Sequence, residues 1–418
     1  MFTRKRMLQL MASLPLLGGV AGAGITTTAT GAKLKRPVYQ RDFITELGLR
    51  PFINARGTYT VLTASLMEDE VMEAINFMSQ HYVNLFDLRD RVGERIAEML
   101  ECEAAMVTAG AASALTLGTA AAITGEDREL ISNLPDIPGP RREVIMQRTH
   151  RFGYDRAVRS TGVRIVEVDS ARDMERKINE NTVMALHFNA ASEHLMERER
   201  FVEIGKKHDV VTFIDAAADV PPVENLFTYT RMGFDMVTFS GGKGIRGPQS
   251  AGLLYGRKDL IEAAKLNHSP YGNAIGRGMK VNKEEMVGMM VALEVYLNKD
   301  HEAEWQEWRR RVDVINREAS EVPSVEAVEY IPEGPANVFP NSRIRWDQKL
   351  IPITPDELST ALRKGHPSIE TDGGREELGI NVAMMRSNEA RIVGRRIREE
   401  LEKVYESGHS NGNRRASG

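Results

Sequence analysis

The sequence predicts an α/β protein with a large domain built on a mostly parallel β-sheet and a small C-terminal α+β domain. Short apolar runs rich in β-branched residues alternate with segments of helical periodicity between residues 71 and 320. Such runs are typical of parallel strands that are buried on both faces of a sheet. Past Pro323 the pattern changes to shorter runs around two helical segments, which indicates the second domain at residues 321–405.

Length and composition limit the kinds of site that we expect. The 418 residues exceed the usual size of one domain, and 42% hydrophobic with 27% charged residues is ordinary for a globular protein. Because 55 basic residues face 59 acidic ones, no overall positive field attracts nucleic acid, and we expect no nucleic-acid partner. Cys102 is the single cysteine, which excludes an intramolecular disulfide and gives no sign of a cysteine metal site.

Residues 1–32 are predicted to be an export signal and a linker. A basic start at residues 3–9 precedes an apolar run at 10–20 and small residues at 21–23. This order is typical of a secretory signal, and the apolar run is too short for a stable membrane span. The basic start is similar to a twin-arginine signal in which Lys5 replaces the second arginine. We expect a bacterial protein that is periplasmic or otherwise exported; an uncut leader is the alternative.

An N-terminal segment at residues 33–70 leads into the large domain at 71–320. Apolar spacing predicts helices around residues 71–78 and 92–100, and a long helical stretch from Glu284 to Ala319. In a parallel sheet, ligands bind at the carboxyl ends of the strands. The strands are predicted at Glu143–Gln147, Val163–Val168, Val183–Phe188, Val210–Ile214, Asp235–Phe239 and Ala251–Tyr255.

The small domain is predicted to contain short strands and two helices. We expect the helices at Pro355–Arg363 and Asn388–Tyr405. Residues 406–418 are polar and contain several glycines, so we expect a disordered tail there. The strands are predicted at Val325–Tyr330, Ser342–Trp346, Ser368–Thr371 and Leu378–Val382.

A lysine in a glycine-rich loop is the most informative local feature. Lys243 lies in the loop at residues 240–248, and Asp215 ends an apolar run 28 residues earlier. Pyridoxal 5'-phosphate (PLP) chemistry needs an amine for a Schiff base and a carboxylate for the pyridinium nitrogen. Taken singly, a solvated lysine in a turn and an aspartate that caps a helix are the ordinary interpretations. Together, Lys243 and Asp215 predict a PLP site in which both are catalytic.

The phosphate of such a cofactor needs hydrogen-bond donors. An alanine-rich helix begins near Gly110 and Ala111, and the free N–H groups and dipole of its first turn can bind a phosphate. A start rich in small residues also serves close packing. Ser240 and Arg246, on either side of Lys243, are predicted to add phosphate contacts.

Three further residues are predicted to contact the cofactor ring. His150 follows a strand and can stack on the ring, although a histidine in this place is also typical of surface or packing roles. Asn189 can donate a hydrogen bond to the ring hydroxyl oxygen, and Ala217 is small enough to lie against the ring face. His187 lies nearer to the buried strand and is expected to be structural.

The predicted substrate-binding residues are Arg56, Thr58 and Arg386. Either arginine can pair with a substrate carboxylate through a two-pronged hydrogen bond. Thr58 belongs to the same segment as Arg56. Tyr271 and His268, in a glycine-rich loop, are candidates to reach across a dimer interface.

Four segments carry a resemblance to a known family: residues 53–58, 147–151, 213–217 and 239–252. With these segments the chain resembles fold-type I PLP enzymes of the selenocysteine synthase (L-seryl-tRNA selenium transferase) group, especially the D-glucosaminate-6-phosphate ammonia-lyase branch. The resemblance implies an aspartate aminotransferase-like large domain, a Schiff-base role for Lys243, a pyridinium partner in Asp215, ring stacking by His150, and a homodimer or larger homo-oligomer. The chain departs from the group in its export signal and in the lack of a basic tRNA-binding extension.

We therefore expect a PLP-dependent lyase that acts on a small amino acid or amino sugar. The reaction would pass through an aldimine and an α-carbanion, with Lys243 as general base and loss of a β-substituent or ammonia. Aminotransferase, aldolase, racemase and oxygen-using oxidase activities remain alternatives, because all of them use the same lysine and aspartate. A catalytically inactive PLP-fold binding protein is the alternative from another class.

Overall fold

The computed structural model describes residues 41–136, 139 and 142–416, and the chain divides into two compact units, Met1–Pro51 and Phe52–Gly418. The predicted export signal and linker lie outside the described residues. The described part of the first unit forms the short helix α2 (Phe43–Glu46), whose start is capped by the Asp42 side chain. Nowhere in the described ranges is a helix long and apolar enough to cross a bilayer.

The second unit contains a seven-stranded sheet with the strand order β2-β8-β7-β6-β5-β3-β4. Its strands are β2 (Ala104–Thr108), β3 (Glu143–Gln147), β4 (Arg164–Val168), β5 (Thr182–Phe188), β6 (Val211–Asp215), β7 (Met236–Ser240) and β8 (Gly252–Gly256). Strands β3 to β7 run parallel, whereas β8 is antiparallel to both β2 and β7. This confirms the predicted fold class, and the six predicted strands match β3 to β8 within one residue at each end. Strand β2 was missed because alanines, which have a low β propensity, fill its start.

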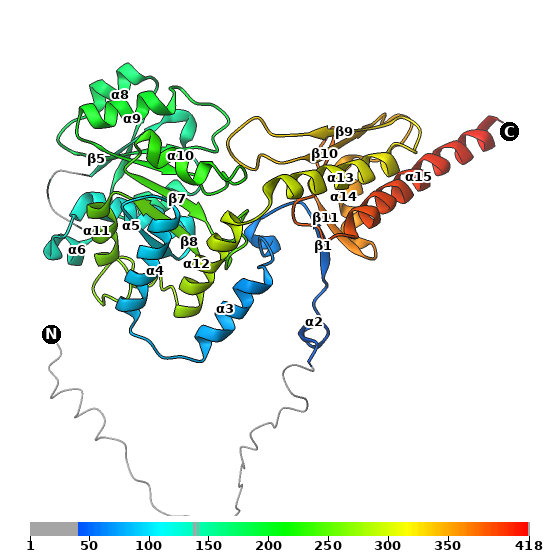
Figure 1. The fold of residues 1–418 in the computed structure, drawn as a ribbon. Coiled ribbons are helices and arrows are strands. Elements are labelled where there is room, and N and C mark those ends of the chain that lie inside the picture. The colour runs from blue at the N-terminus through cyan, green and yellow to red at the C-terminus, as the bar shows by residue number, and fades with distance from the viewer. Residues whose placement is uncertain (1–40, 137–138, 140–141, 417–418) are drawn as a thin grey trace, which may run out of the picture. The chain divides into compact units, whose positions relative to one another are not determined.

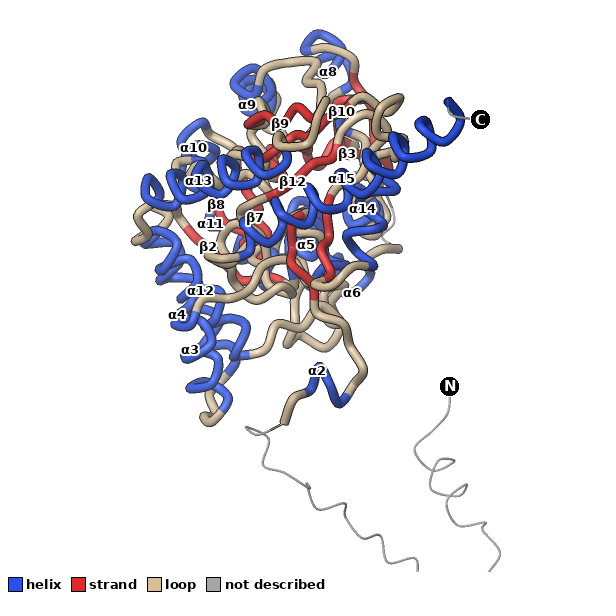
Figure 2. The backbone as a smooth tube through the Cα atoms, turned by 90° about the vertical axis from the view of Figure 1, so that its right-hand side faces the viewer, coloured by secondary structure: helices blue, strands red, loops and turns tan. Residues whose placement is uncertain are grey.

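Helices cover both faces of this sheet (Figures 1 and 2). They are α3 (Asp69–Ser79), α4 (Leu85–Met99), α5 (Gly110–Thr124), α6 (Arg128–Asn133), α7 (Asp155–Arg159), α8 (Ala171–Lys177), α9 (Arg198–Lys207), α10 (Asn225–Met232), α11 (Lys258–Leu266) and α12 (Lys283–Leu297), with the 3-10 turns η2 (Thr60–Leu62) and η3 (Arg148–His150). Along β2, Ala105 and Val107 join one hydrophobic core and Ala104 and Met106 join the other, as the two-residue period of a strand requires. The first core includes residues of α4, α9, α10 and α12, and the second includes residues of α5, α7 and α11.

A separate core supports the small domain. This domain contains the antiparallel sheet β12-β10-β9 and the parallel pair β1-β11. The elements are β1 (Phe52–Ala55), β9 (Val325–Tyr330), β10 (Asn341–Trp346), β11 (Ser368–Thr371), β12 (Leu378–Asn381), α13 (His301–Ala319), α14 (Pro355–Lys364) and α15 (Glu389–Ala416). Trp308 and Ile315 of α13 and Ile53 of β1 belong to this core. The small domain therefore takes in α13 and β1, in contrast to the predicted limits, and Figure 1 shows β1 beside β11.

Two predicted helical limits also differ from the structure. The stretch predicted from Glu284 to Ala319 is two helices, because the side chain of Asp300 accepts a hydrogen bond from the Ala303 amide and starts α13 anew. The tail predicted to be disordered from residue 406 continues α15 to Ala416. Once the packed part of α15 has formed, each added residue extends an existing helix, which costs far less than starting a new one.

The carboxyl ends of the parallel strands lie along one edge of the large sheet. Phe188 at the end of β5 is in register with Asp215 at the end of β6. At the end of β7, Ser240 is in register with Gly252, and Gly252 is in register with Thr108 at the end of β2. The segments that follow β5, β6 and β7 and the start of α5 therefore meet at this edge, which we call the carboxyl edge.

Candidate active site

Lys243 lies in the loop between β7 and β8, and close packing fixes the backbone of this loop. A Cβ atom on Gly242 would lie 2.7 Å from the Cα atom of Gln249, and one on Gly244 would lie 2.4 Å from the carbonyl oxygen of Val220. Neither approach leaves room for a side chain. The glycines around Lys243 are thus required by contacts on both sides of the loop, and they hold the lysine at the carboxyl edge.

Two buried carboxyl groups act on the charge of Lys243. Asp215 and Asp219 are 4% and 0% exposed, and burial raises the pKa of both, that of Asp219 to about 6. Burial also lowers the pKa of Lys243, while the negative charges of the two aspartates oppose this change. The Ala217 amide donates to the Asp215 carboxylate at 3.1 Å and favours its ionised form. Lys243 is therefore closer to its neutral, nucleophilic form than an exposed lysine.

The residues at the carboxyl edge fit PLP. In the described part of the chain, Lys243 and Asp215 form no direct ion pair, and Lys243 lines a cavity of about 390 Å³. At the start of α5, Ala109 makes no side-chain cap and Gly110 adopts a positive φ of 76°, so backbone N–H groups of the first turn remain open to an anion. Lys243 would hold the cofactor aldehyde and Asp215 the ring nitrogen. The half-buried Ala217 agrees with a place against the ring.

The predicted phosphate contact of Arg246 does not agree with the structure. One guanidinium nitrogen donates to Glu68 at 3.0 Å, and the other donates to the carbonyl oxygen of Ala383, also at 3.0 Å. Arg246 is absent from the lining of the cavity at Lys243. Its donors are therefore taken up by Glu68 and by Ala383 of the small domain, and Arg246 links the two parts of the protein. The half-buried Ser240, with Gly110 and Ala111, stays a candidate for the phosphate.

The predicted contact of Asn189 with the ring hydroxyl is also not supported. The side-chain amide of Asn189 donates to Asp219 at 2.6 Å and to the Tyr229 hydroxyl at 2.8 Å. Its carbonyl oxygen accepts a hydrogen bond from Arg198 at 3.1 Å. Both amide protons are therefore used, and Asn189 instead orients the carboxyl group of Asp219, whose charge acts on Lys243.

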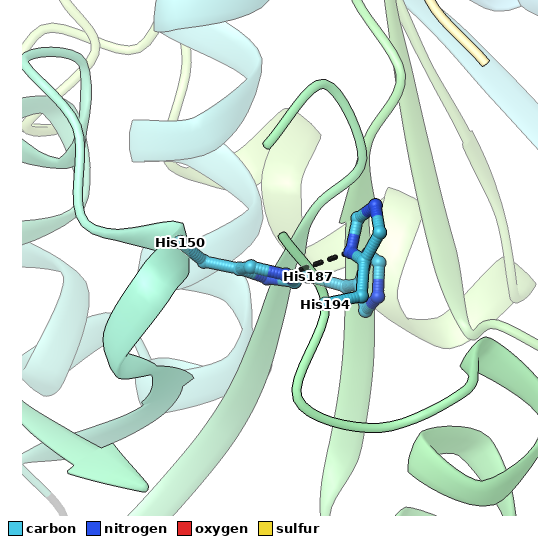
Figure 3. A group of neighbouring side chains, drawn as sticks. All are labelled: His150, His187 and His194. Atoms are coloured by element: carbon cyan, nitrogen blue, oxygen red, sulfur yellow. Dashed lines mark hydrogen bonds between the residues drawn. The ribbon is translucent and has the colours of Figure 1, made fainter. Parts of the chain in front are cut away.

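His150 is buried in a cluster with His187 and His194, as Figure 3 shows. Its exposed fraction is 0%, and it is absent from the lining of the cavity at Lys243. Nε2 of His150 lies 2.9 Å from Nδ1 of His194, and the Phe188 amide donates to Nδ1 of His150 at 3.2 Å. The structure therefore gives His150 no open face for stacking on a cofactor ring, because neighbouring side chains cover it.

Two of the three predicted substrate residues line the cavity with Lys243. Arg56 and Thr58 do so, and Arg56 lies 3.8 Å from Asp372. The side-chain oxygen of Asn54 accepts from the amides of Arg56 and Gly57 at 3.1 and 3.0 Å and so shapes the segment that carries both residues. Within the described residues, Nε of Arg56, the nitrogen nearest to Asp372, is buried and makes no hydrogen bond.

Arg386 lies elsewhere. It is exposed, its amide donates to Glu389 at 2.7 Å, and it lines a separate cavity. Arg386 is absent from the lining of the cavity at Lys243, so it is not part of this site. His268, predicted near a dimer interface, is buried, and its Nε2 lies 2.6 Å from the Met279 carbonyl oxygen.

One side of the cavity was not predicted from the sequence: the small-domain wall, which we define as Asn337, Asn341, Arg343, Asp372 and Asn381. Arg343 is the one cation among these five wall residues, and it pairs with Glu377 at 3.2 Å. These side chains come from segments far apart in the sequence, and no spacing pattern links them. Asn341 and Arg343 alternate with the buried Ser342 and Ile344 along β10, and this alternation was the one signal that the sequence could have given.

Comparisons with known proteins show which family this chain resembles. The family model described as SelA, L-seryl-tRNA selenium transferase, matches residues 52–322. A D-glucosaminate-6-phosphate ammonia lyase of Salmonella typhimurium is 35% identical over 265 residues, which cover 60% of this chain and 69% of that protein. A 5'-C-glycyluridine monooxygenase-decarboxylase of a Streptomyces species is 28% identical over 295 residues, which cover 67% of this chain and 72% of that protein.

Solved structures extend the likeness to the fold. The structure of a D-glucosaminate-6-phosphate ammonia-lyase covers 87% of this chain and 99% of its own, with a TM-score of 0.77 at 28% identity. Solved fold-type I PLP enzymes with 12–15% identity share the fold alone. The segment matched by the family model includes Lys243, Asp215 and the start of α5. The resemblance found in the sequence is confirmed: the chain belongs to the SelA family of L-seryl-tRNA selenium transferases.

Proposed function

We propose that this protein is a PLP-dependent lyase that acts on a small amino acid or amino sugar. The observation that carries the proposal is the placement of Lys243. Lys243 lines a cavity, burial lowers its pKa, and Asp215 lies buried at the end of the adjacent strand. An amine that is readily neutral and a fixed carboxylate are the two groups that PLP enzymes need.

Each group at the site has a separate task in this reaction. When bound, PLP supplies an electron sink that stabilises negative charge at the substrate α-carbon. Lys243 takes the α-proton as a general base, and Asp215 keeps a proton on the ring nitrogen. The N–H groups at the start of α5 bind the phosphate. Arg56 pairs with the substrate carboxylate, and loss of the β-substituent completes the elimination.

One of the reported relatives supports a lyase acting on a polar substrate. The relative that is 35% identical carries the name D-glucosaminate-6-phosphate ammonia lyase. In this chain the cavity is lined by guanidinium, carboxamide and carboxylate groups, which suit a hydroxylated and acidic amine better than an apolar one. A small amino sugar acid is therefore the first substrate class to test.

An oxygen-using decarboxylase is a second candidate. The relative from Streptomyces, named a monooxygenase-decarboxylase, covers a larger share of this chain than the ammonia lyase does. The same lysine and aspartate would serve this chemistry, which differs in the reaction of the substrate carbanion with dioxygen. The two candidates predict different products from the same bound substrate.

Product analysis separates these candidates. Purified protein loaded with PLP is incubated with a panel of amino acids and amino sugar acids, and ammonia, keto acid, carbon dioxide and oxygen uptake are measured. Release of ammonia with keto acid and without oxygen uptake supports the lyase. Oxygen uptake with carbon dioxide release contradicts the lyase and supports the second candidate. Binding without turnover contradicts both and supports an inactive binding protein.

We also propose that the protein is exported and works as a homodimer or larger homo-oligomer. The basic start and apolar run before residue 24 support export, and the family resemblance supports assembly. N-terminal sequencing of protein recovered from the periplasm tests removal of the leader. Light scattering on the mature protein measures its mass, and a monomeric mass would contradict assembly.

A further inference from the structure

Three histidines from three segments meet beside the carboxyl edge (Figure 3). His150 belongs to η3 after β3, His187 to β5, and His194 to the loop between β5 and α9. One ring nitrogen from each lies within 4.8 Å of the other two. His150 and His187 are buried, whereas His194 is exposed. The cluster therefore has a closed inner side and an open side through which a small ion can enter.

The hydrogen bonds of the cluster leave lone pairs unused. Among the described residues, neither ring nitrogen of His187 has a hydrogen-bond partner, although both are buried. A buried polar atom without a partner costs about 1–3 kcal/mol. Burial is also the main reason why the pKa values of all three rings are lowered, that of His150 to about 3. A neutral imidazole is the form in which histidine binds a metal ion.

The loop that carries His194 is held in place by a contact outside the cluster. The buried side-chain oxygen of Gln147 accepts hydrogen bonds from the amides of Leu195 and Met196 at 2.6 and 3.1 Å. His194 therefore stands next to His150 before any ligand arrives. Preorganisation of this kind lowers the cost of bringing ligand side chains together.

We propose that His150, His187 and His194 form a binding site for a divalent transition-metal ion of the Zn²⁺ class. Three imidazole nitrogens with an open fourth position are a familiar donor set for this ion, at a metal-nitrogen distance of about 2.0–2.1 Å. The exposed His194 moves inward, which shortens the distances from its ring nitrogen to those of the other two histidines. Nε2 of His150 becomes a ligand when its proton moves to Nδ1, which breaks the hydrogen bond between Nε2 and His194 and the one that Nδ1 accepts from the Phe188 amide.

The bound ion has a structural role in this proposal. It ties the loop between β5 and α9 to the ends of β3 and β5, next in the chain to Asn189, which is hydrogen-bonded to Asp219. Phe201 and Phe234 contact the His187 ring edge-on at 5.3 and 5.9 Å between centroids and keep the inner side apolar. No step of the proposed reaction depends on the ion, so its test is independent of the PLP assignment.

Metal binding by the full chain tests the proposal, with and without PLP. Protein stripped with a chelator is titrated with Zn²⁺ by calorimetry, and Co²⁺ serves as a visible probe of tetrahedral coordination. We expect one ion per chain, a rise in melting temperature on Zn²⁺ binding, and the absorption of tetrahedral Co²⁺. Removal of a side chain that merely supports a metal ligand typically lowers metal affinity by about 10–100-fold. His194→Ala removes a ligand itself, so we expect it to lower Zn²⁺ affinity by at least about 100-fold.

Two matched variants make the result specific. His194→Cys replaces one zinc ligand with another and is expected to retain the ion, although the ring contacts are lost. His208→Ala removes an exposed histidine at the end of α9, outside the cluster, and is expected to leave affinity unchanged. The proposal is overturned if the wild-type chain binds no Zn²⁺ at micromolar concentration, or if His194→Ala binds as tightly as His208→Ala.

Discussion

The carboxyl edge of the large sheet and the small-domain wall form opposite sides of one cavity, and they are built in different ways. At the edge, Asp215 and Asp219 are buried, and Lys243 lies in a loop whose backbone is fixed by close contacts. On the wall, Arg343 and Asp372 are half-buried and are held by contacts between side chains. We therefore propose that the edge determines the chemistry, while the wall determines which substrate is accepted. Changes at the edge are therefore expected to have larger effects than changes on the wall.

The largest effect is expected for Lys243→Ala. Loss of the amine removes both the covalent anchor for the cofactor and the general base, so turnover is expected to fall by more than about 10⁴-fold. Product release from a substrate found in the panel measures this. Lys265→Ala, which removes a lysine paired with Asp90 and Glu262 away from the cavity, serves as a control for loss of a lysine charge. Comparable turnover of the two variants would contradict the role of Lys243.

A smaller but still large effect is expected for Asp215→Asn. The amide keeps the size of the side chain but cannot hold a proton on the ring nitrogen as a carboxylate does, so kcat is expected to fall by about 10²-fold or more. Steady-state kinetics and PLP content are measured together. Asp219→Asn, which keeps the contacts with Asn189 and Tyr229, is expected to be milder. A larger loss in Asp219→Asn than in Asp215→Asn would reverse the assignment.

The histidines beside the edge predict acid sensitivity in chelator-treated protein. His150 and His187 stay neutral in the folded protein because burial lowers their pKa values, whereas in the unfolded chain they take up protons near pH 6.5. The contribution of His150 to stability is thus complete above about pH 6.5 and falls as the pH drops toward 3, by about 1.4 kcal/mol per pH unit, and His187 acts in the same direction. Denaturant titrations at pH 7 and 5 measure this loss. A His187→Met variant whose stability falls with decreasing pH as steeply as that of the wild type would contradict the account.

The fixed backbone of the lysine loop predicts a loss of stability for Gly244→Ala. A Cβ atom there would lie 2.4 Å from the Val220 carbonyl oxygen, so the loop must shift, at a cost of about 1–3 kcal/mol. Urea denaturation measures the change. Gly272→Ala, with no atom within 4 Å of the added carbon, is the matched control. Equal stability of the two variants would show that the loop is not held as described.

The smallest effects are expected on the wall side of the cavity. Arg56→Lys and Arg343→Lys keep the charge but lose the two-pronged geometry, so KM is expected to rise about tenfold each, with little change in kcat. Arg386→Ala removes an exposed arginine outside this cavity and is expected to leave both constants unchanged. An effect of Arg386→Ala equal to that of Arg56→Lys would contradict the placement of the substrate.

The same difference between edge and wall explains what the sequence could predict. Strands β3 to β8, Lys243 and Asp215 depend on local runs and short motifs, so their positions follow from neighbouring residues. The contacts of Arg246, Asn189 and His150 depend on side chains that only the folded chain brings together. For the same reason, the wall residues and the pairing of β1 with β11 left no pattern in the sequence.

Borohydride reduction of the PLP-loaded protein tests the central claim most directly. Reduction makes the link between the cofactor aldehyde and a lysine permanent, and peptide mass analysis then locates it. The account predicts one modified lysine, Lys243, and loss of the modification in Lys243→Ala while the fold is retained by circular dichroism. An unmodified Lys243 in protein that is saturated with PLP, or a modification at another lysine alone, would contradict it.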